Sequence, residues 1–420
     1  MHETFYHNLP NGVQIVHRKT TSPVVYVGLM IGAGTRHELP NENGMAHYIE
    51  HCLFKGTEHY TARQIINRIE GIGGEINAYT TKEETTFYAA TLSNHFRTTL
   101  HLLADMVLRP TFNKKETDKE VTVILDEIES YNDSPSELIY DDFENMIFEG
   151  SSLAMPILGT KKTLRRISKS PNYPLQWMAQ HYRPERMVLF VLGNVSTQQV
   201  ISAATRELLS NSQYPIANSE ASHSQSPITH SEASYSPSGA SRTYRRHTHQ
   251  THVMLGSYAY PIGHPKQLTM FLLNNILGGG SMSSRLYLSL REKYGLVYNI
   301  DSQAVPLSDT GYWNIYLACE PQYKDQCLEL CHKELRNLRE TTLTSAQLQR
   351  ALRQLEGQMA ISAENQENNA LAMAKQMLYH HRAPQWQETF AKVQQITPSQ
   401  LQEVANEVFA PEKIYTLLYD

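Results

Sequence analysis

The stretch NENGMAHYIEHCLFKGT, residues 41–57, is the part of the chain from which the rest can be interpreted. It places His47 and His51 four residues apart, with Glu50 directly before the second histidine. On a helix, residues i and i+4 lie on one face about one turn apart, so two imidazoles can bind a single ion. Glu50 would lie beside that ion, where a carboxylate could take a proton from a metal-bound water. The pattern alone also fits a surface helix on which these residues are neighbours by chance.

A third metal ligand has to come from another part of the chain. H-x-x-E-H is the reversed form of the zinc-binding H-E-x-x-H motif, and a catalytic zinc takes three protein ligands and leaves one position for water. Residues 113–130 are predicted to be a helix, because apolar residues recur at i, i+3, i+4 and i+7 from Val121. Glu120 and Glu127 lie two turns apart on the flank of that stripe, where a metal would offset the cost of burying a carboxylate. The alternative is that both side chains face solvent.

Three stretches resemble the inverzincin zinc metallopeptidases of the pitrilysin and mitochondrial processing peptidase group, family M16. They are residues 41–57, GGEINAYTTKEETTFYAATL (73–92) and KEVTVILDEIESYNDSP (119–135). The resemblance covers nearly the whole chain and implies a short two-domain bacterial-type member. It also implies one Zn²⁺ per chain. The metal ligands implied are His47, His51 and Glu127, with Glu120 orienting a ligand or the water.

Asn77 and Ala78 follow the glycine turn at residues 73–74 and begin an alternating run toward residue 90. The composition predicts a strand, and the simplest interpretation is an ordinary edge strand. In the family that the chain resembles, the matching edge strand receives the substrate as an added strand. By that resemblance, Asn77 and Ala78 are substrate-binding residues.

The stretch ILGGGSMSSRLYLSLREKYGLVYNI, residues 276–300, contains a second group of candidate functional residues. Its glycines predict a loop before a helix, and Gly295 ends that helix before a strand at 296–302. The spacing of a dinucleotide or phosphate loop is absent, which disfavours nucleotide binding. Arg291 and Tyr298 match the family's residues that reach the substrate, where a guanidinium can hold a carbonyl and a phenol can stabilise an oxyanion. The alternative is a helical Arg–Glu pair and an ordinary strand tyrosine.

The composition is that of a soluble globular protein. The formal charge is −5, from 37 basic and 42 acidic residues among 420, which does not favour nucleic-acid binding. We find no apolar run long enough to span a membrane and no secretory leader after the first two residues. The four cysteines show no disulfide spacing. We therefore expect a cytoplasmic protein.

The chain divides at a Ser-, Pro- and His-rich stretch, residues 211–241, which predicts an extended linker. Before it, residues 1–210 are predicted to form the metal-binding catalytic domain. After it, residues 242–420 form a homologous second domain. The fold class predicted is α+β, with two duplicated domains, each a mostly antiparallel sheet covered by helices on one face. A second metal site is a further hypothesis for the histidines that follow the linker: His247, His249 and His252.

The sequence therefore predicts a zinc-dependent peptidase of unfolded peptides or short polypeptides, in which Glu50 is the general base and Tyr298 assists the oxyanion. A His2Glu site also accepts cobalt or manganese. Larger relatives join four such domains around a chamber, so the resemblance implies a homodimer with an enclosed chamber and shared active sites. Two other classes are a non-catalytic scaffold or processing subunit, which the intact motif disfavours, and a metal-storage or metal-sensing protein.

Overall fold

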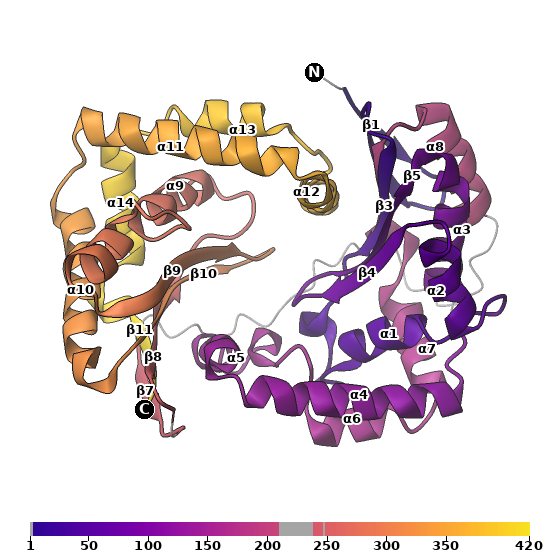
Figure 1. Ribbon diagram of the computed structural model, residues 1–420, viewed down its shortest axis with the longest axis horizontal. Helices are drawn as coiled ribbons and strands as arrows, with labels where there is room; N and C mark the ends of the chain where they lie inside the picture. Colours follow the sequence, from indigo (N-terminus) through magenta and orange to yellow (C-terminus); the bar gives the residue numbers. More distant parts are fainter. Residues whose placement is uncertain (1–2, 210–237, 247) are drawn as a thin grey trace, which may run out of the picture. The chain divides into compact units, whose positions relative to one another are not determined.

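Two β-sheets, each with its own helices, make up the part of the chain that this computed structural model describes, residues 3–209, 238–246 and 248–420. Unit 1 contains the described residues within 1–129, 151–231 and 363–384. Unit 2 contains those within 130–150, 232–362 and 385–420. Both units combine a mostly antiparallel sheet with helices (Figure 1), which confirms the predicted α+β class. Most of the predicted linker, and His247, lie outside the described residues.

Sheet 1 forms the centre of unit 1 and has the strand order β1-β2-β6-β3-β5-β4. Neighbouring strands are antiparallel except β2 and β6, which are parallel. The alternating run expected from residue 77 to residue 90 is two strands, β4 and β5, because residues 81–84 turn the chain between them. The strands are β1 (Thr4–Asn8), β2 (Gln14–Lys19), β3 (Val24–Ile31), β4 (Glu75–Thr80), β5 (Thr85–Leu92) and β6 (Met187–Gly193).

One face of sheet 1 is covered by helices from the first half of the chain (Figure 1). The inward side chains of β3 and β6, such as Val27, Leu29 and Leu189, are fully buried in this core. Helix α4 matches the helix predicted at 113–130. The helices are α1 (Met45–Leu53), α2 (Ala62–Glu70), α3 (Phe96–Leu108), α4 (Lys114–Asn132), α6 (Lys161–Ile167), α7 (Asn172–His181) and α8 (Thr197–Ala204).

Sheet 2 repeats this topology in the order β7-β11-β8-β10-β9. Its first pair is parallel and the others are antiparallel, as in the matching part of sheet 1, β2-β6-β3-β5-β4. This agreement supports the predicted duplication. The strands are β7 (Ser241–Tyr244), β8 (Thr251–Tyr258), β9 (Val297–Pro306), β10 (Gly311–Cys319) and β11 (Tyr415–Tyr419). The helices of the second half are α9 (Gln267–Leu277), α10 (Lys324–Glu340), α11 (Ser345–Glu364), α12 (Gln366–His380), α13 (Trp386–Val393) and α14 (Pro398–Val408).

The second face of each sheet is covered by a helix from the other half of the chain. Helix α12 lies on sheet 1 and buries Met373 and Met377 against β3 and β6. Helix α5 (Pro135–Ile147) lies on sheet 2, where the ring of Phe143 is 6.3 Å from that of Tyr312. Because α5 follows α4 and α12 follows α11, the two helices occupy equivalent places in the duplicated halves. The exchange explains why all of β6 is buried and why its sequence, MVLFVLG, does not alternate.

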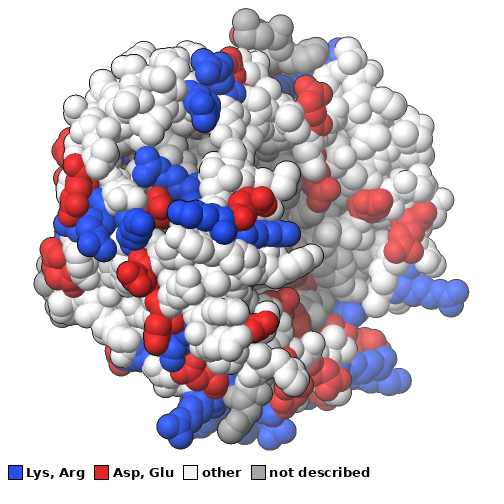
Figure 2. Space-filling model, turned by 60° about the vertical axis from the view of Figure 1, so that its left-hand side comes forward, with Lys and Arg blue, Asp and Glu red and all other residues white. Residues whose placement is uncertain are grey.

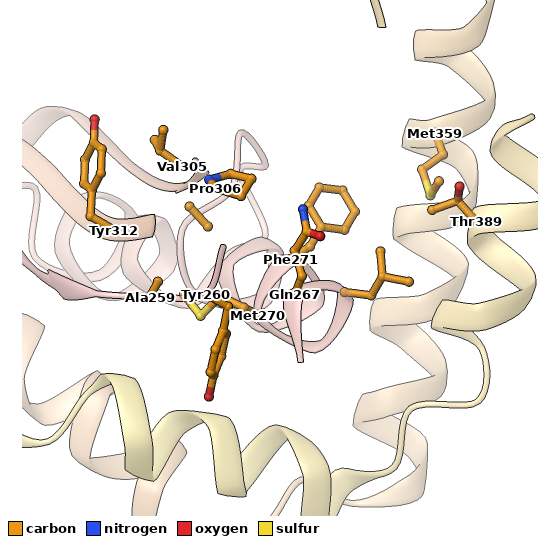
Figure 3. A pocket seen from close by; sticks show the side chains of 12 residues that line it. Ala259, Tyr260, Gln267, Met270, Phe271, Val305, Pro306, Tyr312, Met359 and Thr389 are labelled. Atoms are coloured by element: carbon orange, nitrogen blue, oxygen red, sulfur yellow. The ribbon is translucent and has the colours of Figure 1, made fainter. Parts of the chain in front are cut away.

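An apolar pocket opens in unit 2 between β9, α9, α11 and α13 (Figure 3). Its volume is about 220 Å³, and Met270, Phe271, Pro306 and Met359 contribute to its walls. On the face of the molecule drawn in Figure 2, basic and acidic side chains are interspersed. Within the described residues, no helix is both long enough and apolar enough to cross a membrane.

Candidate metal centre

Helix α1 carries the H-x-x-E-H residues, and its first turn is fixed by the chain before it. The helix begins after Gly44, whose φ of 91° is in the left-handed region that favours glycine. The buried carboxylate of Glu38 accepts hydrogen bonds from the backbone N–H groups of Gly44 and Ala46, each at 2.8 Å. A carboxylate at this end of a helix also interacts favourably with the helix dipole. On this anchored helix the rings of His47 and His51 lie on one face with centroids 4.6 Å apart.

Helix α4 brings Glu127 to the two histidines. Oε2 of Glu127 is 3.5 Å from Nε2 of His51 and 3.8 Å from Nε2 of His47. One ligand atom of each residue lies within 4.8 Å of the others, and no other such group of three occurs among the described residues. Two imidazoles and one carboxylate match the donor set of a catalytic zinc site, which keeps a fourth position for water. The side chain of Glu127 is 43% exposed, so the cluster is open to solvent.

Glu120, one of the carboxylates noted on α4, contacts the other nitrogen of His51. Its Oε2 lies 3.2 Å from Nδ1 of His51, and its Oε1 lies 2.7 Å from Nζ of Lys55. When Nδ1–H donates to Glu120, the lone pair of Nε2 is left on the side of Glu127. Such a partner fixes the tautomer and orientation of a histidine that binds a metal. The sequence did not identify Lys55, which lies four residues after His51, just beyond the end of α1.

Burial and neighbouring groups shift the pKa values of all three residues of the cluster. Burial, together with the neighbouring His51, lowers the pKa of His47 to about 4, so its imidazole is neutral at pH 7. The hydrogen bond from His51 lowers the pKa of Glu127 despite partial burial. For His51, burial lowers the pKa, but the hydrogen bonds to Glu127 and Glu120 outweigh burial and raise it. Nδ1 of His47 is buried and has no hydrogen-bond partner within the described part of the chain.

Glu50 lies beside the cluster and is held from β4. Oε2 of Glu50 accepts a hydrogen bond of 2.6 Å from the hydroxyl of Thr80. Burial raises the pKa of Glu50, although Thr80 and His51 oppose the shift. A carboxylate whose pKa is raised toward neutrality is better suited to accept a proton. The sequence analysis did not single out Thr80, although strand alternation places it on the same face of β4 as Ala78.

The predicted substrate residues lie on β4, which forms an edge of sheet 1. Ala78 packs toward the core on the side of α1, whereas Asn77 is exposed on the other face. The side-chain Oδ1 of Asn77 accepts a hydrogen bond of 2.9 Å from the backbone N–H of Ala78. Among the described strands, β4 pairs only with β5, so its outer edge offers backbone groups that an extended peptide can use.

Arg291 and Tyr298 lie in unit 2 and contact each other. Arg291 is on the π-helix η6 (Tyr287–Lys293), which precedes β9, and Nη1 of Arg291 donates to the backbone carbonyl of Tyr298 at 2.9 Å. Its guanidinium also lies 5.0 Å from the ring centre of Tyr287 and 5.1 Å from that of Tyr298. The Tyr298 side chain is 73% exposed. Stacking holds the guanidinium while most of its N–H groups stay available.

The remaining candidates from the sequence form no comparable site. His252 lies on β8, where its Nδ1 is 3.0 Å from the hydroxyl of Tyr316, and His249 is exposed. Within the described residues, neither belongs to a cluster of three metal-ligating side chains. The four cysteines, Cys52, Cys319, Cys327 and Cys331, are free and buried.

Two family models match the chain. Residues 14–161 match the model described as Insulinase (Peptidase family M16). Residues 175–355 match the model described as Peptidase M16 inactive domain. The first range contains the whole metal cluster, and the second contains Arg291 and Tyr298.

Similar proteins occur in several bacteria. A Bacillus subtilis protein named "Uncharacterized zinc protease YmxG" is 32% identical over 97% of this chain and 96% of that protein. A Streptomyces coelicolor protein that is also named an uncharacterized zinc protease is 31% identical over 95% of this chain and 86% of that protein. Among solved structures, a protease from Helicobacter pylori has a TM-score of 0.89 at 20% identity, with both chains fully covered. A peptidase M16 inactive domain from Pseudomonas fluorescens has a TM-score of 0.86 at 19% identity, covering 99% of this chain and 97% of that chain. At these identities the two structures support the fold alone.

Proposed function

The chain belongs to peptidase family M16, and we propose that it is a zinc-dependent peptidase that hydrolyses unfolded peptides or short polypeptides. The observation that carries this proposal is the convergence of two imidazoles from α1 (His47 and His51) and one carboxylate from α4 (Glu127), with Glu50 also on α1. Zinc protease relatives that match nearly the whole chain support the same class of activity.

His47, His51 and Glu127 would hold the metal, and Glu120 would orient His51 through its Nδ1. Bound zinc would supply a Lewis acid that polarises the scissile carbonyl and lowers the pKa of a water molecule. Glu50 accepts the proton of the attacking water and later donates it to the leaving amine. The phenol of Tyr298 donates to the developing oxyanion, and Arg291 holds a substrate carbonyl or carboxylate.

The substrate would bind as an extended strand along the outer edge of β4. Main-chain pairing of this kind holds a peptide with limited dependence on its side chains. Asn77 and Ala78 supply the backbone groups nearest the middle of the strand. Only a flexible segment can add to an edge strand, which is why we propose peptides and unfolded chains as substrates.

We further propose that the working unit is a homodimer in the cytoplasm. The support is the resemblance to larger relatives, in which four such domains surround a chamber, whereas this chain provides two duplicated sheets. In the dimer, each active site would combine the metal cluster of one chain with Arg291 and Tyr298 of its partner.

Hydrolysis of a quenched fluorogenic peptide library by the zinc-loaded protein tests the proposed activity. Activity should be lost on chelation and return with zinc. Glu50→Gln should keep stoichiometric zinc but lose about 10²- to 10⁴-fold in turnover, because the amide cannot accept the proton. Asp126→Asn, an exposed carboxylate on α4, is the matched control and should behave as wild type. A protein that binds zinc but cleaves no peptide would instead be a scaffold or a metal-binding protein.

A further inference from the structure

We propose that Thr80 is a positioning residue for Glu50. We also propose that helix α12 holds Thr80 in place through the turn at residues 81–84, which follows Thr80. The inference deepens the proposed peptidase function and rests on it. It gives a specific task to a helix from the second half of the chain, which carries none of the metal-ligating residues.

The contact between Thr80 and Glu50 leaves one carboxylate oxygen free. The Thr80 hydroxyl donates to Oε2 at 2.6 Å, and it is the one hydrogen-bond donor to Glu50 found among the described residues. A glutamate has three rotatable side-chain bonds, so without this donor its carboxylate can leave the position beside the metal cluster. With Oε2 occupied, Oε1 is the oxygen available to accept a proton. The hydroxyl therefore selects both the place and the orientation of the base.

Thr80 is the last residue of β4, so the turn at residues 81–84 determines where its side chain lies. The turn is closed by a hydrogen bond of 2.8 Å from the backbone N–H of Thr81 to the carbonyl of Glu84. It is also tied to the 3₁₀ helix η1 (Thr35–His37), which follows β3, because the backbone N–H of Arg36 donates to the carbonyl of Lys82 at 2.8 Å. The guanidinium of Arg36 forms a buried ion pair with Glu83.

Helix α12 supplies the donors for the other buried glutamate of the turn. The Glu84 side chain is 2% exposed, and a carboxylate buried without partners would cost several kcal/mol. Nζ of Lys375 donates to Oε1 at 2.7 Å, and the hydroxyl of Tyr379 donates to Oε2 at 2.6 Å. The two donors lie one turn apart on α12 and hold both oxygens of the carboxylate. Through Glu84, the helix fixes the turn and therefore the end of β4.

The first test compares Thr80→Val, which removes the hydroxyl at nearly constant volume, with Thr80→Ser, which keeps it. We expect Thr80→Val to lower kcat by about 10- to 100-fold, the range for a misplaced catalytic group. Its KM and zinc content should stay near wild type, and Thr80→Ser should retain most of the activity. Tyr379→Phe and Lys375→Met should lower kcat in the same direction but by less, because each leaves one donor on Glu84.

Thr91→Val is the matched control, since it removes a buried threonine hydroxyl of β5 that bonds Thr99 at 3.1 Å, away from Glu50. Its kcat should not change. A wild-type kcat in Thr80→Val overturns the proposal. Equal losses in Thr80→Val and Thr80→Ser also overturn it, because the hydroxyl would then not be the cause.

Crystal structures of the zinc-loaded Thr80 variants give a second readout that does not require activity. The Glu50 carboxylate should keep its position in Thr80→Ser and leave it in Thr80→Val. An unmoved Glu50 in Thr80→Val would refute the positioning role whether or not the protein cleaves peptides. Conversely, if Glu50 is displaced in Thr80→Val and the wild-type protein has no peptidase activity, the positioning role is retained and the proposed reaction is rejected.

Discussion

Replacing Glu120 by Gln should weaken zinc binding without removing a ligand. In the wild type, the carboxylate of Glu120 lies 3.2 Å from Nδ1 of His51 and its side chain is 9% exposed. A hydrogen bond to a charged group is worth about 1.5–3 kcal/mol, and losing such a partner of a metal-binding histidine costs about 10- to 100-fold in affinity. Lys55 neutralises part of the carboxylate's charge from 2.7 Å. We therefore expect a loss near the lower limit, about 10- to 30-fold, or about 1.4–2 kcal/mol.

The affinity can be measured by competition with a chromophoric zinc chelator at constant pH. Glu116→Gln is the control, because Glu116 lies one turn earlier on α4 and pairs with Lys119 at 2.8 Å. Lys55→Met tests whether Lys55 lowers or raises the affinity for zinc. If Lys55 offsets the charge of Glu120, its removal should leave zinc affinity unchanged or raise it. Wild-type affinity in Glu120→Gln, or a clear loss in Lys55→Met, would refute this account of the contact.

Three further outcomes are expected. Glu127→Ala should lose most bound zinc, whereas Asp126→Ala should keep it, because the side chain of Asp126 points about 100° away from that of Glu127 on α4. Metal analysis of the two variants after gel filtration tests this. A mixture of inactive Glu50→Gln and inactive Arg291→Ala should regain activity once subunits exchange, because one site of the mixed dimer is then wild type; no recovery after verified exchange would exclude shared sites. Burial lowers the pKa of His17 to about 4, below the unfolded value of about 6.5. The unfolded chain therefore binds more protons between these pH values, and stability falls as the pH falls, by as much as about 2–3 kcal/mol near pH 4. In the presence of EDTA, the Tm of His17→Leu should depend less on pH over this range than that of the wild type.

The metal cluster could be predicted because its geometry is local to two helices. Four-residue spacing places His47 and His51 on one face whatever surrounds the helix, and a distance of two turns gives Glu120 and Glu127 a common flank. The resemblance to known peptidases then linked the two helices. The contact between Glu50 and Thr80 could not be predicted in the same way, because it depends on how closely the end of β4 approaches α1. Alternation from Ala78 indicates the correct face of the strand, but it does not give a distance.

The exchange of α5 and α12 was beyond sequence reasoning for a different reason. An apolar stripe shows that a helix is covered, but it does not identify the sheet that covers it. In α12 the stripe consists of Ala370, Met373, Ala374 and Met377, which would fit either sheet. The strand β6 carried an indirect signal. A run of seven apolar or small residues without alternation is typical of a strand that is buried on both faces, and a sheet covered on one face does not explain it.

This exchange bears on how the two halves of the chain depend on each other. A fragment that ended before the predicted linker would retain His47, His51 and Glu127 but would lack α12. Val16, Met30 and Phe190, fully buried under α12, would then be exposed on the uncovered face of sheet 1. Glu84 would at the same time lose both of its donors on α12 and remain beside a second glutamate, Glu83. The match to an inactive domain in the second half therefore does not make that half dispensable, since it completes the core and the turn on which the proposed catalytic base depends.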